Sequence, residues 1–270
     1  MKKTVGFLLV LVMLVSCFAP SAFAASTTTY TSLVTGVLDR LEENDDRCTS
    51  AAQQAVNGSY RLVELFAIIA MNNANTQAQE DFVSNVLDDW EAKDNSSSGA
   101  PQQLVNGTYR TTELLLCIAY IFNTGNKYTE LIEGVVDDFD ANNKSSSGAP
   151  QQAVNGLYRS FELLTIIALE NYSTSDELDL ISSVMDDYDS GNKSANSAPQ
   201  QQVNGAYRMV DMLTVLAMEL DTTGRFTSMI SDIRDTFKAQ NNSANGAPQQ
   251  LVNGLYRSVE LAAIVAMLLE

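Results

Sequence analysis

Residues 151–163 read Gln-Gln-Ala-Val-Asn-Gly-Leu-Tyr-Arg-Ser-Phe-Glu-Leu, and close variants of this phrase occur five times along the chain. The copies are 49 residues apart with no insertion or deletion, as the arginines show: Arg61, Arg110, Arg159, Arg208 and Arg257. A fixed period of about 20 to 50 residues is typical of stacked supersecondary units. The sequence therefore predicts five units, over 26–74, 75–123, 124–172, 173–221 and 222–270.

Each unit reads as a pair of helices. In the unit 173–221, residues 177–189 place apolar side chains at helical spacing and Asp186, Asp187 and Asp189 on the other side. The polar residues 190–197 predict a loop. Pro199 then suits the first turn of a second helix that extends to about Glu219. No segment has a convincing strand pattern, so we predict an all-α protein built of αα-hairpins.

The same pattern predicts the other helices. The first helices begin near Ser32, Gln79, Lys127 and Phe226, and further second helices cover about 101–122, 150–171 and 248–269. The polar residues 95–99 and 143–148 are also expected to form loops, which gather on one rim.

Hairpins repeated in this way form either an open solenoid or a closed ring. An open array needs terminal units with a polar outer face. The final helix has the opposite character, because residues 262–269 are all apolar. Either the first unit covers this surface, which gives a closed (α/α)5 toroid, or a second copy of the chain covers it in a homo-oligomer. We favour the toroid.

The first 24 residues predict a secretory signal peptide. Lys2 and Lys3 precede an apolar run over 5–15, and Ala22-Phe23-Ala24 is a typical cleavage site. The run is too short to favour a membrane-spanning helix. Cys17 leaves lipid anchoring open as an alternative, although cleavage after Ala24 agrees better with the repeat boundaries. We expect 25–270 to be a single exported repeat domain, secreted, periplasmic or on the cell surface.

Composition excludes several classes of function. Without Lys2 and Lys3 the chain has 14 basic and 33 acidic residues, a net charge of −19, which disfavours nucleic acid and anionic membranes as partners. The chain has no histidine, the usual general base and transition-metal ligand. We expect no metal and no cofactor.

One face of the second helix keeps its polar side chains in every copy. At 100° per residue, the Asn, Tyr, Arg and Glu or Asp of the phrase fall on one arc. The residue after each glycine instead varies, from serine to leucine, and we expect it to face away from the arc. The candidate site comprises Asn57, Tyr60, Arg61, Glu64, Asn106, Tyr109, Arg110, Glu113, Asn155, Tyr158, Arg159, Glu162, Asn204, Tyr207, Arg208, Asp211, Asn253, Tyr256, Arg257 and Glu260.

Two interpretations of the arc remain open. In the first, the side chains form a ladder of hydrogen bonds between units, since buried polar groups need partners. The glycine of each phrase agrees with closely packed helices. In the second, the arc binds sugar hydroxyls or carboxylates in a cavity or groove.

We expect a binding protein and not an enzyme. Every candidate carboxylate occurs in four or five equivalent places, whereas an active site needs different groups around one substrate. The leading hypothesis is a protein that binds a polysaccharide or a cell-envelope protein multivalently. The alternative is a structural subunit that assembles through residues 262–269. A carbohydrate-active toroid enzyme is the third possibility.

Overall fold

The computed structural model describes residues 29–270, so the predicted signal peptide and Cys17 lie outside the described residues. The described part contains ten α-helices, one short 3₁₀ helix and no strand, and the predicted all-α class is confirmed. The helices are α2 (Tyr30–Asp45), α3 (Ala51–Asn73), α4 (Gln77–Ser96), α5 (Ala100–Phe122), η1 (Thr124–Asn126), α6 (Thr129–Ser145), α7 (Ala149–Asn171), α8 (Ser175–Ser194), α9 (Ala198–Leu220), α10 (Thr227–Ser243) and α11 (Ala247–Leu268).

The helices α5, α7, α9 and α11 match the predicted second helices to within one residue at each end, and their prolines lie in the first turn. The predicted loops were wrong in part. Residues 190–194 belong to α8, and α4 and α6 likewise extend through Ser96 and Ser145. The connections to the following helices are therefore shorter than the composition suggests.

Tertiary contacts explain why these polar residues are helical. The Tyr158 hydroxyl of α7 donates to Asn192 Oδ1 in the last turns of α8 at 3.0 Å. The Tyr109 hydroxyl of α5 makes the same bond to Asn143 of α6 at 2.9 Å. A neighbouring helix thus holds a turn whose own residues have weak helix propensity.

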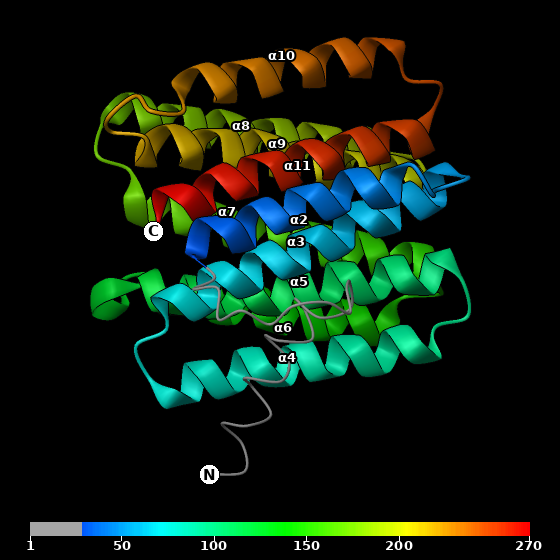
Figure 1. Cartoon of the computed structure of the whole chain (residues 1–270), viewed down its shortest axis with the longest axis horizontal. Helices are drawn as coiled ribbons and strands as arrows, with labels where there is room; N and C mark the ends of the chain where they lie inside the picture. Colours follow the sequence, from blue (N-terminus) through cyan, green and yellow to red (C-terminus); the bar gives the residue numbers. More distant parts are fainter. Residues whose placement is uncertain (1–28) are drawn as a thin grey trace, which may run out of the picture.

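The odd-numbered helices form an inner layer. Each of α3, α5, α7, α9 and α11 packs against two others of this set, and α11 packs against α3 as well as α9. The even-numbered helices lie outside them: α4 packs on α5 and α3, and α2 packs on α3 and α11 (Figure 1). Adjacent outer helices consequently flank a groove whose floor is one inner helix.

Glycine sets the close approach of the inner helices. A Cβ atom on Gly156 would lie 2.7 Å from Thr108 Oγ1, 2.8 Å from Thr108 Cβ and 3.1 Å from the Thr108 carbonyl carbon. The glycine of each phrase packs against the residue that follows the equivalent glycine of the previous unit. Gly58 packs in the same way against Leu255 of the last unit. These variable residues are therefore buried between inner helices: Ser59, Thr108, Leu157, Ala206 and Leu255.

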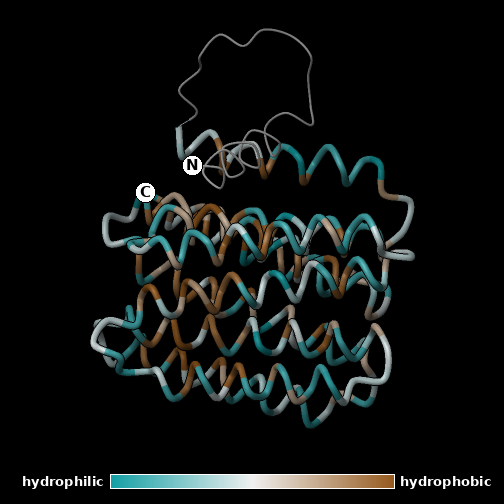
Figure 2. Tube along the Cα trace, turned by 90° about the horizontal axis from the view of Figure 1, so that it is seen from below, coloured by the Kyte–Doolittle hydropathy of each residue, from teal (hydrophilic) through white to brown (hydrophobic). Residues whose placement is uncertain are grey.

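Most of the apolar segment 262–269 is covered within the chain itself. Residues 262–266 are buried, and apolar segments gather inside the bundle toward the end where the C-terminus lies (Figure 2). Of the described helices, α11 is long and apolar enough to cross a membrane, but most of its apolar stretch is buried among other helices. Beside it, Thr31 Oγ1 donates to Glu270 Oε2 at 2.8 Å, so the two ends of the described chain are in contact.

Candidate functional site

The five predicted asparagines link the two layers. Each donates from Nδ2 to a main-chain carbonyl sixteen residues earlier, on the outer helix that precedes it. Asn155, for example, donates to Phe139 O at 2.9 Å. The others donate over 2.9 to 3.1 Å: Asn57 to Leu41, Asn106 to Trp90, Asn204 to Tyr188 and Asn253 to Phe237.

The five tyrosines link each inner helix to the next outer helix. The Tyr158 ring stacks edge-on against Tyr188 of α8, with 4.9 Å between ring centroids. The tyrosine hydroxyls donate hydrogen bonds to residues 34 positions later: Tyr60 to Asp94 and Tyr207 to Asn241, for example. The last tyrosine, Tyr256, donates to Asp45 Oδ1 at 2.7 Å and receives a bond from Asn57 Nδ2 at 3.3 Å. The contact between the last and first units thus has the pattern of the internal ones.

The arginines and acids lie on the groove floors. Each arginine pairs with the acid three residues later, over 2.7 to 3.2 Å: Arg61 with Glu64, Arg110 with Glu113, Arg159 with Glu162, Arg208 with Asp211 and Arg257 with Glu260. Three of these arginines also bind an exposed carboxylate on the outer helix, over 2.9 to 3.0 Å: Asp89, Asp138 and Asp187.

Burial shifts the pKa values of the floor carboxylates. Loss of hydration raises the pKa of Glu162 to about 7, against the opposing effect of the Arg159 charge. The pKa values of Glu113, Asp211 and Glu260 are raised for the same reason. These acids therefore accept protons more readily in the folded chain than in an exposed peptide.

This shift predicts a pH dependence of stability. The pKa of Glu162 is raised above the usual 4.5, so between about pH 4.5 and 7 the folded chain binds more protons than the unfolded chain. The free energy of unfolding should then fall as the pH rises through this window. In Glu162→Gln, we expect the free energy of unfolding to fall by about 1 to 2 kcal/mol less over this pH window than in the wild type. This figure includes a discount for the partial exposure of Glu162. Thermal melts from pH 4.5 to 8 measure it, with the exposed Glu133→Gln as control. Equal slopes in the two variants would contradict the assignment.

The groove over α11, between α10 and α2, differs from those over α5, α7 and α9. At the position of Asp89, Asp138 and Asp187 the last unit has Thr236, so Arg257 has Glu260 as its ion-pair partner and no carboxylate from α10. Asn253 is buried and its Oδ1 accepts no hydrogen bond within the described chain, as is also the case for Asn57, Asn106 and Asn155. The Arg257 guanidinium therefore keeps hydrogen-bonding capacity on the floor of this groove.

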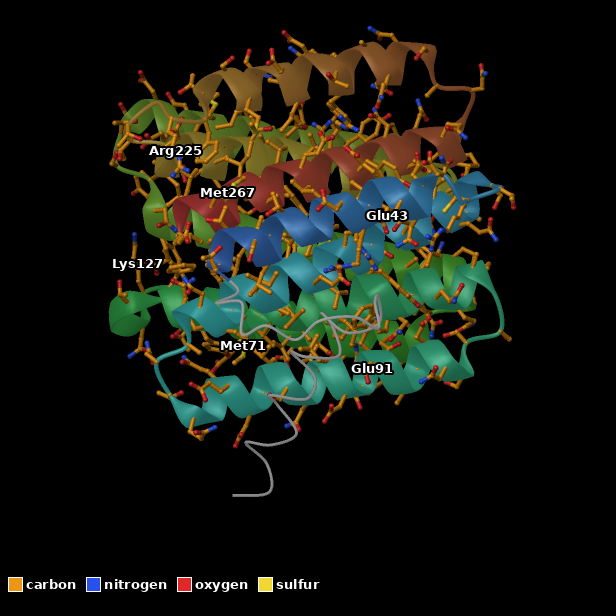
Figure 3. The ribbon with its side chains drawn as sticks, in the orientation of Figure 1. Glu43, Met71, Glu91, Lys127, Arg225 and Met267 are labelled. Atoms are coloured by element: carbon orange, nitrogen blue, oxygen red, sulfur yellow. The ribbon has the colours of Figure 1, made fainter. Side chains whose placement is uncertain are left out.

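Two cavities lie along this groove and share Arg257. The first is polar and has a volume of about 420 Å³; it is lined by Asp45, Gln54, Gln240, Ser243, Ala244, Asn245, Gln249, Val252, Asn253, Tyr256 and Arg257. The second, of about 340 Å³, is mainly apolar and includes Leu38, Met229, Ile233 and Met267. Met267, labelled in Figure 3, lies near the end of α11.

The structure brings three of the predicted residues, Asn253, Tyr256 and Arg257, into one polar cavity. The sequence did not identify Asp45, Gln54, Gln240 or Gln249 as their neighbours. Asp45 comes from the first unit and Gln240 from the last, so the cavity depends on a contact that the repeat pattern alone does not specify. No group of three or more acidic or cysteine side chains within 29–270 is arranged to hold a metal.

No protein-family model, curated protein or solved structure matches the chain. A functional assignment therefore rests on the chemistry of the groove itself.

Proposed function

We propose that the chain is an exported, closed (α/α)5 toroid that binds a neutral polysaccharide in the polar groove over α11. Closure is supported by the packing of α11 on α3 and by the bonds of Tyr256 to Asp45 and Asn57. The observation that carries the binding proposal is the polar cavity of about 420 Å³, whose lining combines Gln, Asn, Tyr, Arg and Asp side chains.

Sugar hydroxyls fit this lining because each both donates and accepts hydrogen bonds. Gln240 and Gln249 are exposed at the cavity and offer amide donors and acceptors. Asp45 offers carboxylate acceptors, and Arg257 offers guanidinium donors beyond those paired with Glu260. This predominance of amide and hydroxyl groups favours a polysaccharide over an apolar protein segment.

The charge of the chain favours a neutral polymer. The net charge of −17 repels polyanions, and Asp45 lies in the cavity beside Arg257, its one cation. Asp45 already accepts hydrogen bonds from Tyr256 and Gln54, so we assign it to positioning and propose that no glycosidic bond is cleaved.

Calorimetric titration with soluble neutral oligosaccharides of at least four sugars tests this proposal. We expect Gln249→Ala and Arg257→Lys each to weaken binding by about fivefold or more, because a lost hydrogen bond to a ligand costs about 1 kcal/mol and lysine lacks the guanidinium fork.

The repeat supplies matched controls. Gln102→Ala and Arg159→Lys alter the equivalent positions in other units, away from the cavity, and should leave affinity unchanged. Uronic-acid oligosaccharides of equal length should bind more weakly than neutral ones. The proposal fails if no neutral oligosaccharide binds at millimolar concentration, or if the control variants weaken binding as much as the groove variants.

A further inference from the structure

A third cavity lies on the axis of the molecule, at the end where the five inner helices begin. It has a volume of about 200 Å³ and is lined by side chains from α3, α5, α7, α9 and α11. Almost all of this lining is alanine methyl groups, proline rings and leucine side chains. The cavity is separate from the groove over α11, with which it shares no lining residue.

The size of the inward side chains explains why the axis is hollow at this end only. Toward the other end, large side chains such as Phe66, Leu115 and Leu164 leave only about 10 Å³. At the hollow end, one inward position of the repeat is alanine in two units and leucine in two others. The alanines are Ala55 and Ala153, and the leucines are Leu104 and Leu251. The short side chains do not reach the axis, so the cavity is a pit with a closed floor.

The remaining unit places Gln202 at this position, the one polar side chain in the lining. Gln202 is 8% exposed, and its Nε2 donates to Pro150 O at 2.9 Å. Its Oε1 accepts no hydrogen bond from residues 29–270. This amide oxygen keeps a free lone pair, so a donor that enters the pit can bind it in place of water.

We propose that this axial pit binds a small apolar molecule with one hydrogen-bond donor, of the size and kind of a phenol. A dry apolar cavity of about 150 Å³ can hold benzene, so the volume here admits a single substituted ring. The ring packs against the alanine and proline side chains, and its hydroxyl donates to Gln202 Oε1. Five helix N-termini surround the mouth, and their positive potential disfavours a cationic ligand.

Titration with three probes of similar size tests the pit: phenol, toluene and benzylammonium. Phenol should bind most tightly and benzylammonium least. Ala153→Leu should abolish binding of phenol and toluene, because leucine fills the pit and already occupies this position in two units. Gln202→Leu should weaken phenol about tenfold, to the affinity of toluene or below, since the acceptor is lost and some volume is filled.

Ala141→Leu, on the exposed surface of α6, serves as the control and should change neither the affinity for phenol nor that for toluene. Circular dichroism establishes that each variant is folded. The inference is overturned if neither phenol nor toluene binds at its solubility limit, or if Ala153→Leu and Gln202→Leu both bind phenol as the wild type does. Oligosaccharide binding in the outer groove should be unaffected by either variant, so the two sites can fail independently.

Discussion

Replacing Gly156 with alanine should lower the free energy of unfolding by about 3 kcal/mol, the upper part of the range for overpacked cores. The new methyl group would lie 2.8 Å from Thr108 Cβ and 3.1 Å from the Thr108 carbonyl carbon. The carbonyl carbon is main chain, so the clash cannot be relieved by a change of rotamer and α5 and α7 must separate. Urea denaturation followed by circular dichroism measures the change.

Gly134→Ala is the matched control. Gly134 lies within α6, and a Cβ atom there would have no neighbour within 4 Å. Alanine should therefore stabilise the chain by about 0.5 to 1 kcal/mol, since it restricts the unfolded state and favours the helix. If both substitutions change stability in the same direction, helix propensity and not interhelical contact governs these glycines.

Removing the last unit, residues 222–270, should abolish the native packing of the whole chain. The truncation deletes α11, which packs on both α3 and α9. Asn57 then loses its hydrogen bond to Tyr256, and Gly58 loses its packing contact with Leu255. The apolar sides of α3 and α9 become exposed. Folded domains are stable by only about 5 to 15 kcal/mol, and we expect the loss of these contacts to exceed that margin. We expect a weak near-ultraviolet circular dichroism signal and aggregation during size-exclusion chromatography.

The opposite outcome is equally informative. In an open array each unit contacts only its neighbours, so the four remaining units would stay folded with slightly reduced stability. A soluble, cooperatively unfolding truncation would therefore contradict the closed arrangement proposed above.

The helices could be predicted from the sequence because the 49-residue period and the prolines mark their starts. The ends of α4, α6 and α8 could not, because Asp94, Asn143 and Asn192 in their last turns accept hydrogen bonds from tyrosines of the preceding inner helices. Composition describes a residue's own preference, whereas these turns are stabilised by a contact far away in sequence.

The candidate site shows the same limit. The polar arc was identified, and its members make the repeated contacts between helices. The groove over α11 depends on a departure from the repeat, since Thr236 replaces the acid that pairs with Arg110, Arg159 and Arg208 in their units. The sequence contained this difference, but its effect on Arg257 is visible only once α10 is placed beside α11.

The hydrogen bond between Thr31 and Glu270 has a consequence for how the chain could be connected. The two ends meet beside a junction built from the same tyrosine and asparagine contacts as the internal junctions. The contacts between helices therefore do not depend on which unit comes first in the gene. A circularly permuted chain, joined across this junction and opened in another loop, would keep every contact between its helices.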